Sequence, residues 1–73
     1  MDNESIRNVV MLELIAPEDP EKRLISEEEG KALYLRYNEG NRNWDYIFEP
    51  IKDKGFRDKM IQLYKTLDNN NEG

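Results

Sequence analysis

The chain has neither cysteine nor histidine, and these two absences narrow its possible folds more than any other feature. Without cysteine, neither a disulfide nor a thiolate metal site can stabilise a domain of 73 residues, so an apolar core must do so alone. The same absences remove the commonest zinc ligands, the cysteine nucleophile and the usual general base. We therefore expect one small binding domain, residues 1–67, that is not an enzyme and holds no metal and no cofactor.

Charge is distributed unevenly along the chain, whose net charge is −5. Residues 1–30 carry nine acidic and three basic side chains, whereas residues 31–67 carry eight basic and five acidic ones. An acidic half joined to a mildly basic half suits docking on a protein surface of mixed charge, because duplex DNA would repel the acidic half. A generic solvated surface is the alternative interpretation.

The hydropathy pattern argues against a membrane protein. The longest uninterrupted apolar run, Val9–Leu12, is far too short to cross a bilayer. The first residues are acidic, where a signal peptide would be basic. We expect a soluble monomer in a reducing cytoplasm, that of a host bacterium if the chain is encoded by a phage.

Residues 5–16 fit a strand better than a helix when the two patterns are compared. Apart from Asn8, the even positions from Ile6 to Ala16 carry apolar side chains, as in a half-buried strand. A helix would place Glu13 beside Val9 and Val10 on an apolar stripe, where a carboxylate would need a partner. The pattern therefore favours a strand.

A turn and a return strand are expected next. Pro17–Pro20 forces a turn, and Arg23–Ile25 offers a short return strand. Residues 5–25 would then form a β-hairpin, which is not stable alone in water. It would pack on the helices or pair its free edge with another chain.

The clearest element is a helix that begins after Ser26. Three acids, Glu27–Glu29, follow this residue, as in a capping box at the positive end of a helix dipole. We therefore interpret the acidic run as helix capping and not as a metal site. The helix is expected to continue to Tyr37 and to end in left-handed fashion at Asn38–Gly40, with Gly30 as its weak point.

Two further helices are expected. Asn43 can cap a short helix that Pro50 stops, and a third helix should run from about Phe56 to Leu67. Their apolar side chains recur at helical spacing and predict the buried faces: Trp44, Ile47, Phe48 and Ile51 in the first, and Phe56, Met60, Leu63, Tyr64 and Leu67 in the second. Residues 68–73 have nothing to bury and should form a disordered tail. The predicted fold class is α+β and mainly helical, with the hairpin followed by three short helices in residues 26–67.

Five basic residues are candidates for partner binding: Arg7, Lys52, Lys54, Arg57 and Lys59. The last four form the densest basic cluster and suit phosphate or an acidic protein surface, although a plain solvated face is the alternative. Arg7 is expected on the polar face of the first strand, either as a lone surface arginine or as a docking contact. Trp44 is expected in the core, and a partner pocket is the alternative.

Residues 24–67 resemble the helix-turn-helix unit of sigma-factor region 4 and of response-regulator output domains. The resemblance lies in Leu24, Ser26–Glu29, Ala32–Tyr37 and Glu39–Gly40, with Trp44–Ile47 at the first motif helix and Phe56–Leu67 at the recognition helix. Pro50 interrupts the first motif helix, and Asp53 and Asp58 lie where a groove-reading helix needs neutral or basic residues. The scaffold is thus implied, while DNA binding by the chain alone is not expected.

Small size, acidity, the lack of catalytic residues and a sigma-like helical half make the chain similar to small bacteriophage-encoded regulators that bind host RNA polymerase. The similarity implies a host-takeover role: inhibition of initiation by competition with sigma, antitermination, and contacts with the large polymerase subunits. A helix-turn-helix repressor that reads DNA through Phe56–Leu67 is one alternative. An acidic antitoxin-like or anti-defence inhibitor, which imitates nucleic acid, is the other.

Overall fold

Residues 3–70, which the computed structural model describes, form four α-helices and one turn of 3₁₀-helix, with no strand among them. The elements are α1 (Asn3–Ile15), η1 (Pro20–Lys22), α2 (Glu27–Tyr37), α3 (Trp44–Ile47) and α4 (Lys54–Asn70). The prediction of an α+β fold with a hairpin over residues 5–25 is therefore wrong, and the fold is all-α. No free sheet edge exists in this region for strand pairing with another chain.

The first helix replaces the expected strand because its buried stripe differs from the one considered in the sequence. Arg7, Met11 and Leu14 are the buried residues of α1, spaced as one face of a helix. Glu13 lies outside this stripe and is exposed, so the helix needs no buried partner for it. The expected return strand is also absent: Arg23 donates a hydrogen bond from Nη1 to the carbonyl oxygen of Ile15 at 3.2 Å.

The capping box of α2 is confirmed. The Ser26 hydroxyl accepts from the Glu29 backbone N–H at 3.1 Å, and the Glu29 carboxylate accepts from the Ser26 N–H at 2.7 Å. The other Glu29 oxygen accepts from the Lys52 N–H at 2.7 Å, which links α2 to the segment before α4. These backbone hydrogen bonds lower the pKa of Glu29 below its ordinary value.

The structure explains why glycine occupies positions 30 and 40, within α2 and shortly after it. Gly40 has φ of +90°, a left-handed conformation that favours glycine after a helix. Gly30 is buried where α2 approaches α1, and a Cβ there would lie 3.4 Å from the Ile15 carbonyl oxygen. The apparent weak point of α2 is thus the place where the two helices come closest.

The short and long helices that follow begin and end for local reasons. Asn43 caps α3, as predicted, by accepting from the Tyr46 N–H at 3.2 Å. The helix lasts a single turn before Pro50. Helix α4 begins two residues earlier than expected and continues through Asp68 to Asn70, so residues 68–70 do not belong to a disordered tail. Residues 71–73 lie outside the described part of the chain.

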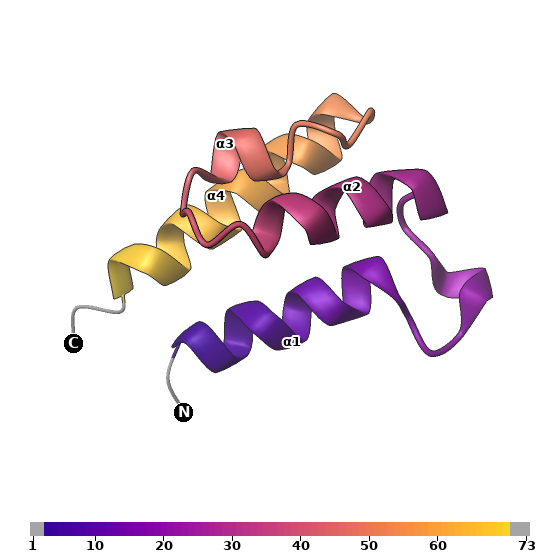
Figure 1. Ribbon diagram of the computed structural model, residues 1–73, viewed down its shortest axis with the longest axis horizontal. Helices are drawn as coiled ribbons and strands as arrows, with labels where there is room; N and C mark the ends of the chain where they lie inside the picture. Colours follow the sequence, from indigo (N-terminus) through magenta and orange to yellow (C-terminus); the bar gives the residue numbers. More distant parts are fainter. Residues whose placement is uncertain (1–2, 71–73) are drawn as a thin grey trace.

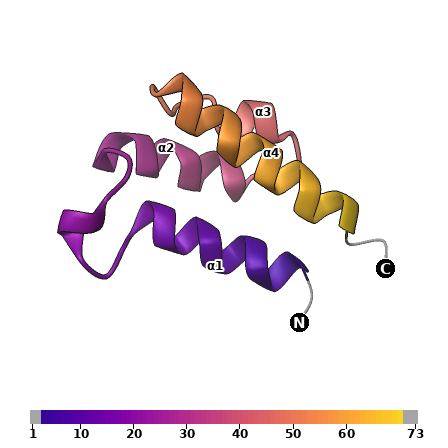
Figure 2. The ribbon, with the colours of Figure 1, turned by 180° about the vertical axis from the view of Figure 1, so that it is seen from behind.

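The four helices enclose one core. Helices α1 and α2 run side by side in opposite directions, and α4 crosses behind α2 and α3 (Figure 1). The reverse view shows α4 passing in front of α2 (Figure 2). Because α1 packs on both α2 and α4, it has one flank beside each. Its first residues thereby lie near the last turns of α4.

The core contains all four residues predicted for the short helix: Trp44, Ile47, Phe48 and Ile51 are buried. The Tyr64 ring lies edge-on to the rings of Phe48 and Trp44, with centroids 5.0 and 5.1 Å away. In α4, Met60 and Tyr64 are buried as expected, but Leu63 is 40% exposed and Ile61 is buried instead. The expectation that Leu63 belongs to the core is therefore wrong.

Candidate partner-binding surface

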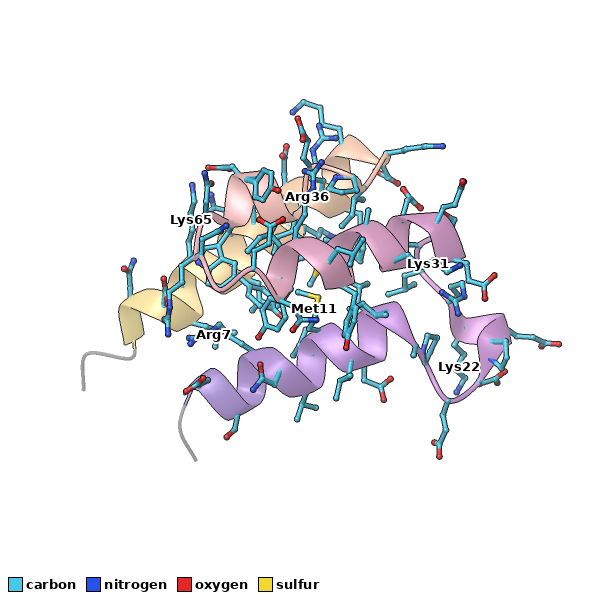
Figure 3. The ribbon with its side chains drawn as sticks, viewed as in Figure 1. Arg7, Met11, Lys22, Lys31, Arg36 and Lys65 are labelled. Carbon is cyan, nitrogen blue, oxygen red and sulfur yellow. The ribbon has the colours of Figure 1, made fainter. Side chains whose placement is uncertain are left out.

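Helix α1 carries more apolar side chains than its core face can bury. Val9 and Leu12 remain exposed although Met11 and Leu14 on the same helix are buried. In Figure 3, Arg7 and Met11 point from α1 toward the helices packed on it. The exposed side chains of α1 therefore make no contribution to the core, and their position needs another explanation.

Helix α2 presents a matching set beside them. Tyr34 and Leu35 are half to two-thirds exposed, and they line a groove with Leu12 and Ile15 of α1 and with Ala16, which follows this helix. The groove has a volume of about 430 Å³, and the only charged side chain that lines it is Lys31. We call Leu12, Ile15, Ala16, Tyr34 and Leu35 the α1–α2 apolar surface. A contiguous apolar surface of this kind on a small protein is typical of an interaction site.

Helices α1 and α2 are joined beside this surface by a hydrogen bond at one end and by close backbone packing at the other. The Tyr37 hydroxyl of α2 donates a hydrogen bond to the Asn8 side-chain oxygen of α1. Burial raises the pKa of Tyr37 above its ordinary value, so the hydroxyl stays protonated and can donate at neutral pH. At the other end, Gly30 allows the backbone of α2 to approach Ile15. The two helices are therefore fixed relative to each other before any partner binds.

Arg7, one of the five predicted binding residues, is not on the surface. Its side chain is 2% exposed, and its Nη1 lies 3.5 Å from Asp68 Oδ1 near the end of α4. This buried Nη1 makes an ion pair but no hydrogen bond. Its guanidinium lies 5.9 Å from the centre of the Trp44 ring, and its backbone carbonyl accepts from the Tyr64 hydroxyl at 2.7 Å. The prediction of a surface or docking arginine is wrong: Arg7 joins α1 to α3 and α4.

Asp68 contacts two other side chains in addition to Arg7. Besides the Arg7 ion pair, it accepts from Arg42 Nη1 at 2.7 Å and from Trp44 Nε1 at 3.3 Å. The three partners come from different parts of the chain: the ion-pair partner from α1, and the two hydrogen-bond donors from the segment after α2 and from α3. This carboxylate explains why α4 extends past Leu67, since its last turn holds the counter-charge of a buried arginine.

The other four predicted binding residues lie before and within the first turns of α4, away from the α1–α2 apolar surface. Lys52, Lys54 and Lys59 are exposed, and Lys54 pairs with Asp58 at 3.0 Å. Arg57 is half-buried and donates from Nη1 to the Ile51 carbonyl oxygen at 2.8 Å, so it caps the end of the preceding segment. These residues are close in sequence, and Arg57, one of the four, makes a hydrogen bond within the fold.

The residues of the α1–α2 apolar surface were missed because residues 5–16 were interpreted as a strand. Read as a helix, Val9, Leu12 and Ala16 recur at i, i+3 and i+7, beside the stripe of Met11 and Leu14. A helix with two adjacent apolar stripes is too apolar for a single buried face. That excess is the signal from which the surface could have been found.

The described residues offer no other obvious chemistry. Within residues 3–70, no group of three or more histidine, cysteine, aspartate or glutamate side chains could hold a metal ion. None of the helices in this range is sufficiently long and apolar to cross a membrane. No family model, curated protein or solved structure matches the chain. The functional argument therefore depends on the surface of the molecule itself.

Proposed function

We propose that the chain is a protein-binding regulator without catalytic activity, which docks on its partner through the α1–α2 apolar surface. The observation that carries the proposal is the exposure of Leu12 and Leu35, 59% and 67%, beside the same groove. Burying the exposed part of each leucine is worth about 1–2 kcal/mol, so a partner that covers both gains appreciable affinity. Aromatic Tyr34 adds an amphipathic side chain of the type enriched at interfaces.

Bacterial RNA polymerase is the first partner to test, and its large subunits are the proposed contact. This choice rests on the resemblance of residues 24–67 to a sigma-factor domain. Competition is the proposed mechanism: where the chain occupies a polymerase surface that a sigma domain also uses, initiation falls while elongation proceeds. Because the expected hairpin edge does not exist, the helical surface takes the place of strand pairing in this proposal.

A purified binding assay against core polymerase and holoenzyme tests the proposal. We expect a complex with core polymerase at micromolar concentrations, and we expect excess sigma to dissociate it. The double variant Leu12→Glu/Leu35→Glu should weaken binding by about 100-fold or more, because about 3 kcal/mol of apolar burial is lost and two carboxylates are desolvated. Unchanged far-ultraviolet circular dichroism should show that the variant still folds, since both leucines are exposed.

Leu63→Glu is the matched control. Leu63 is also an exposed leucine, but it lies on α4 and does not line the groove, so its substitution should leave polymerase binding unchanged. If neither core polymerase nor holoenzyme binds the parent chain, the polymerase proposal is wrong. If the double variant binds as well as the parent, the α1–α2 apolar surface is not the contact.

Fewer observations support the alternative function, a DNA-binding repressor, than support the protein-binding regulator. Helix α3 has only four residues, so the first helix of a helix-turn-helix pair is reduced to one turn. Asp53 and Asp58 accompany the start of α4, where phosphate or base contacts would be needed. A steep salt-dependent gel shift on a specific duplex would favour the repressor over the protein-binding regulator.

A further inference from the structure

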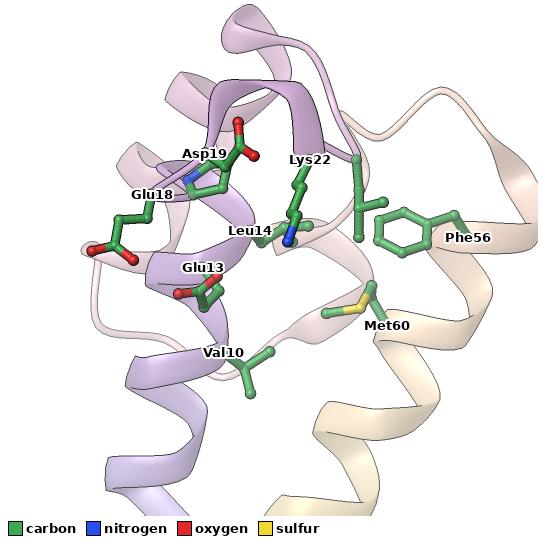
Figure 4. Close-up of a pocket in the computed structure, with 10 residues that line it drawn as sticks. Val10, Glu13, Leu14, Glu18, Asp19, Lys22, Phe56 and Met60 are labelled. Atoms are coloured by element: carbon green, nitrogen blue, oxygen red, sulfur yellow. The ribbon is translucent and has the colours of Figure 1, made fainter.

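A second hollow lies on the other flank of α1, between this helix, η1 and α4. Its floor is apolar and includes Leu14 of α1 and Met60 and Phe56 of α4, and its volume is about 340 Å³ (Figure 4). Leu24, which also lines the hollow, is 72% exposed and is the most exposed large apolar side chain among the described residues. We call this hollow the α1–α4 pocket.

The rim of the α1–α4 pocket is acidic. Glu13, Glu18 and Asp19 line it, against a single cation, Lys22. Among residues 3–70, none of these four side chains takes part in an ion pair within 4 Å. Asp19 is held in place because its Oδ1 accepts from the Glu21 backbone N–H at 3.0 Å. Three carboxylates that take part in none of these ion pairs therefore line the pocket together with its apolar floor.

The geometry points to a basic amphipathic segment of another protein as the occupant of this pocket. In such a segment a large apolar side chain covers Leu14 and Met60, while a neighbouring lysine or arginine meets the carboxylates of Glu13 and Glu18. The surrounding charge agrees, because residues 1–30 carry nine acids and three bases and attract a cationic partner before contact. This inference deepens the proposed function, on which it rests, by naming the chemistry of the partner.

The same charges disfavour two other occupants. A second copy that docked through the same pocket would bring its own acidic rim to this one, which costs free energy through repulsion. Nucleic acid and anionic lipid would be repelled for the same reason. A basic segment is the occupant for which rim and floor are both complementary.

Substitution of Lys22 tests this assignment, because it should change the affinities of basic and acidic partners in opposite directions. In Figure 4 the Lys22 side chain extends from η1 toward Leu14, so it places a positive charge beside the apolar floor and repels a cationic segment that approaches the pocket. Removing that cation should help a basic partner and harm an acidic one. Lys22→Glu should therefore tighten the binding of a basic segment about 5-fold, whereas Glu13→Lys combined with Glu18→Lys should weaken it at least 10-fold.

The experiment uses the full chain and a synthetic helical peptide of leucine and lysine, with a leucine and glutamate peptide of the same pattern as its counterpart. Titration followed by amide chemical shifts should show perturbation at Leu14, Leu24 and Met60, only with the basic peptide, and weaker binding as salt is raised. Glu39→Lys is the control variant. It changes one charge in the same direction on an exposed residue beyond the other end of α2, so it should weaken binding far less than the pocket variants.

Several results would overturn the inference. These are equal binding of the acidic peptide, perturbation confined to the α1–α2 apolar surface, no tightening in Lys22→Glu, or the same loss in Glu39→Lys as in the pocket variants. Shifts at the pocket that depend on protein concentration without peptide would instead assign it to a second copy. The outcome is separable from the polymerase assay, because Leu12 and Leu35 do not line the α1–α4 pocket. A negative result in the peptide titration therefore does not decide the polymerase assay, and the reverse also holds.

Discussion

Replacing Asp68 should destabilise the fold more than replacing its buried partner Arg7, although Asp68 is the more exposed of the two. Asp68→Asn leaves a guanidinium that is 2% exposed without its carboxylate, and an uncompensated buried charge costs about 3–5 kcal/mol. The lower end of that range, about 3 kcal/mol, applies here because the ion pair is 3.5 Å long and Asp68 is 27% exposed. Arg7→Met leaves no such charge, because Asp68 keeps its contacts with Arg42 and Trp44.

The two substitutions should therefore lower the free energy of unfolding by different amounts, and the effect of one should depend on whether the other is present. Arg7→Met should change the free energy of unfolding by no more than about 1 kcal/mol, since similar apolar volume replaces a buried ion pair. In the double variant the asparagine should add only about 1 kcal/mol, instead of about 3, which gives a coupling energy of about 2 kcal/mol between the two positions. For a domain of this size, Asp68→Asn should lower Tm by about 15 °C.

Urea denaturation, followed by circular dichroism and by Trp44 fluorescence, measures these values. Trp44 is a suitable reporter because its Nε1 donates to Asp68 at 3.3 Å and Arg7 lies near its ring. The reasoning is refuted if Arg7→Met costs as much as Asp68→Asn, or if the double variant equals the sum of the single ones. Either result would mean that Asp68 acts through its other partners and not as the counter-charge of Arg7.

Three further predictions concern the helix cap, the buried tyrosine and the core. The pKa of Glu29 is depressed in the fold, so its stabilisation is present above its unfolded value and is lost as pH falls through the folded value. Glu29→Gln should therefore flatten the acid side of a plot of urea midpoint against pH, and an unchanged slope would contradict this. Burial raises the pKa of Tyr64 far above its ordinary value of 10, so the stabilisation is complete below about pH 10 and is lost at higher pH. Tyr64→Phe should cost about 1 kcal/mol at neutral pH, through the lost hydrogen bond to Arg7, and should reduce the alkaline loss of stability in the same titration. Trp44→Ala should cost about 3–5 kcal/mol in thermal melts, whereas Leu63→Ala should cost under about 1 kcal/mol; similar melts for the two variants would overturn the assignment of Leu63 to the surface.

The elements predicted correctly are those that local signals determine. Ser26 and Glu29 lie three residues apart and satisfy each other's backbone, so the start of α2 is encoded within one turn. Asn43 before α3 and Gly40 after α2 act in the same way, through hydrogen bonds or backbone conformations of their immediate neighbours. Such signals do not depend on the rest of the fold.

The sequence did not predict the first helix, because Glu13 interrupts the apolar stripe near Val9 and Val10 and the stripe that is actually buried includes a charged residue, Arg7. Arg7 counts against a core face unless its counter-charge is known, and that counter-charge, Asp68, lies near the other end of the chain. The same ion pair explains the error at the C-terminal end, where Asp68 appears to belong to a polar tail. One long-range contact therefore contributes to both errors, and the incorrect strand prediction for residues 5–16 concealed the α1 part of the α1–α2 apolar surface as well.

The position of α1 links partner binding to the stability of the fold. Its inner face is anchored by Arg7 and Met11, while the α1–α2 apolar surface and the α1–α4 pocket lie on its two flanks. A partner that covers either flank binds only the chain in which α1 is packed in place, so binding adds stability in proportion to the logarithm of partner concentration. The free energy gained is the same for a chain whose α1 is weakly anchored, but the fraction of such chains that binding converts to the folded state is larger. Asp68→Asn should therefore show a greater fractional recovery of helical structure on binding than the parent, even though it alters neither docking surface.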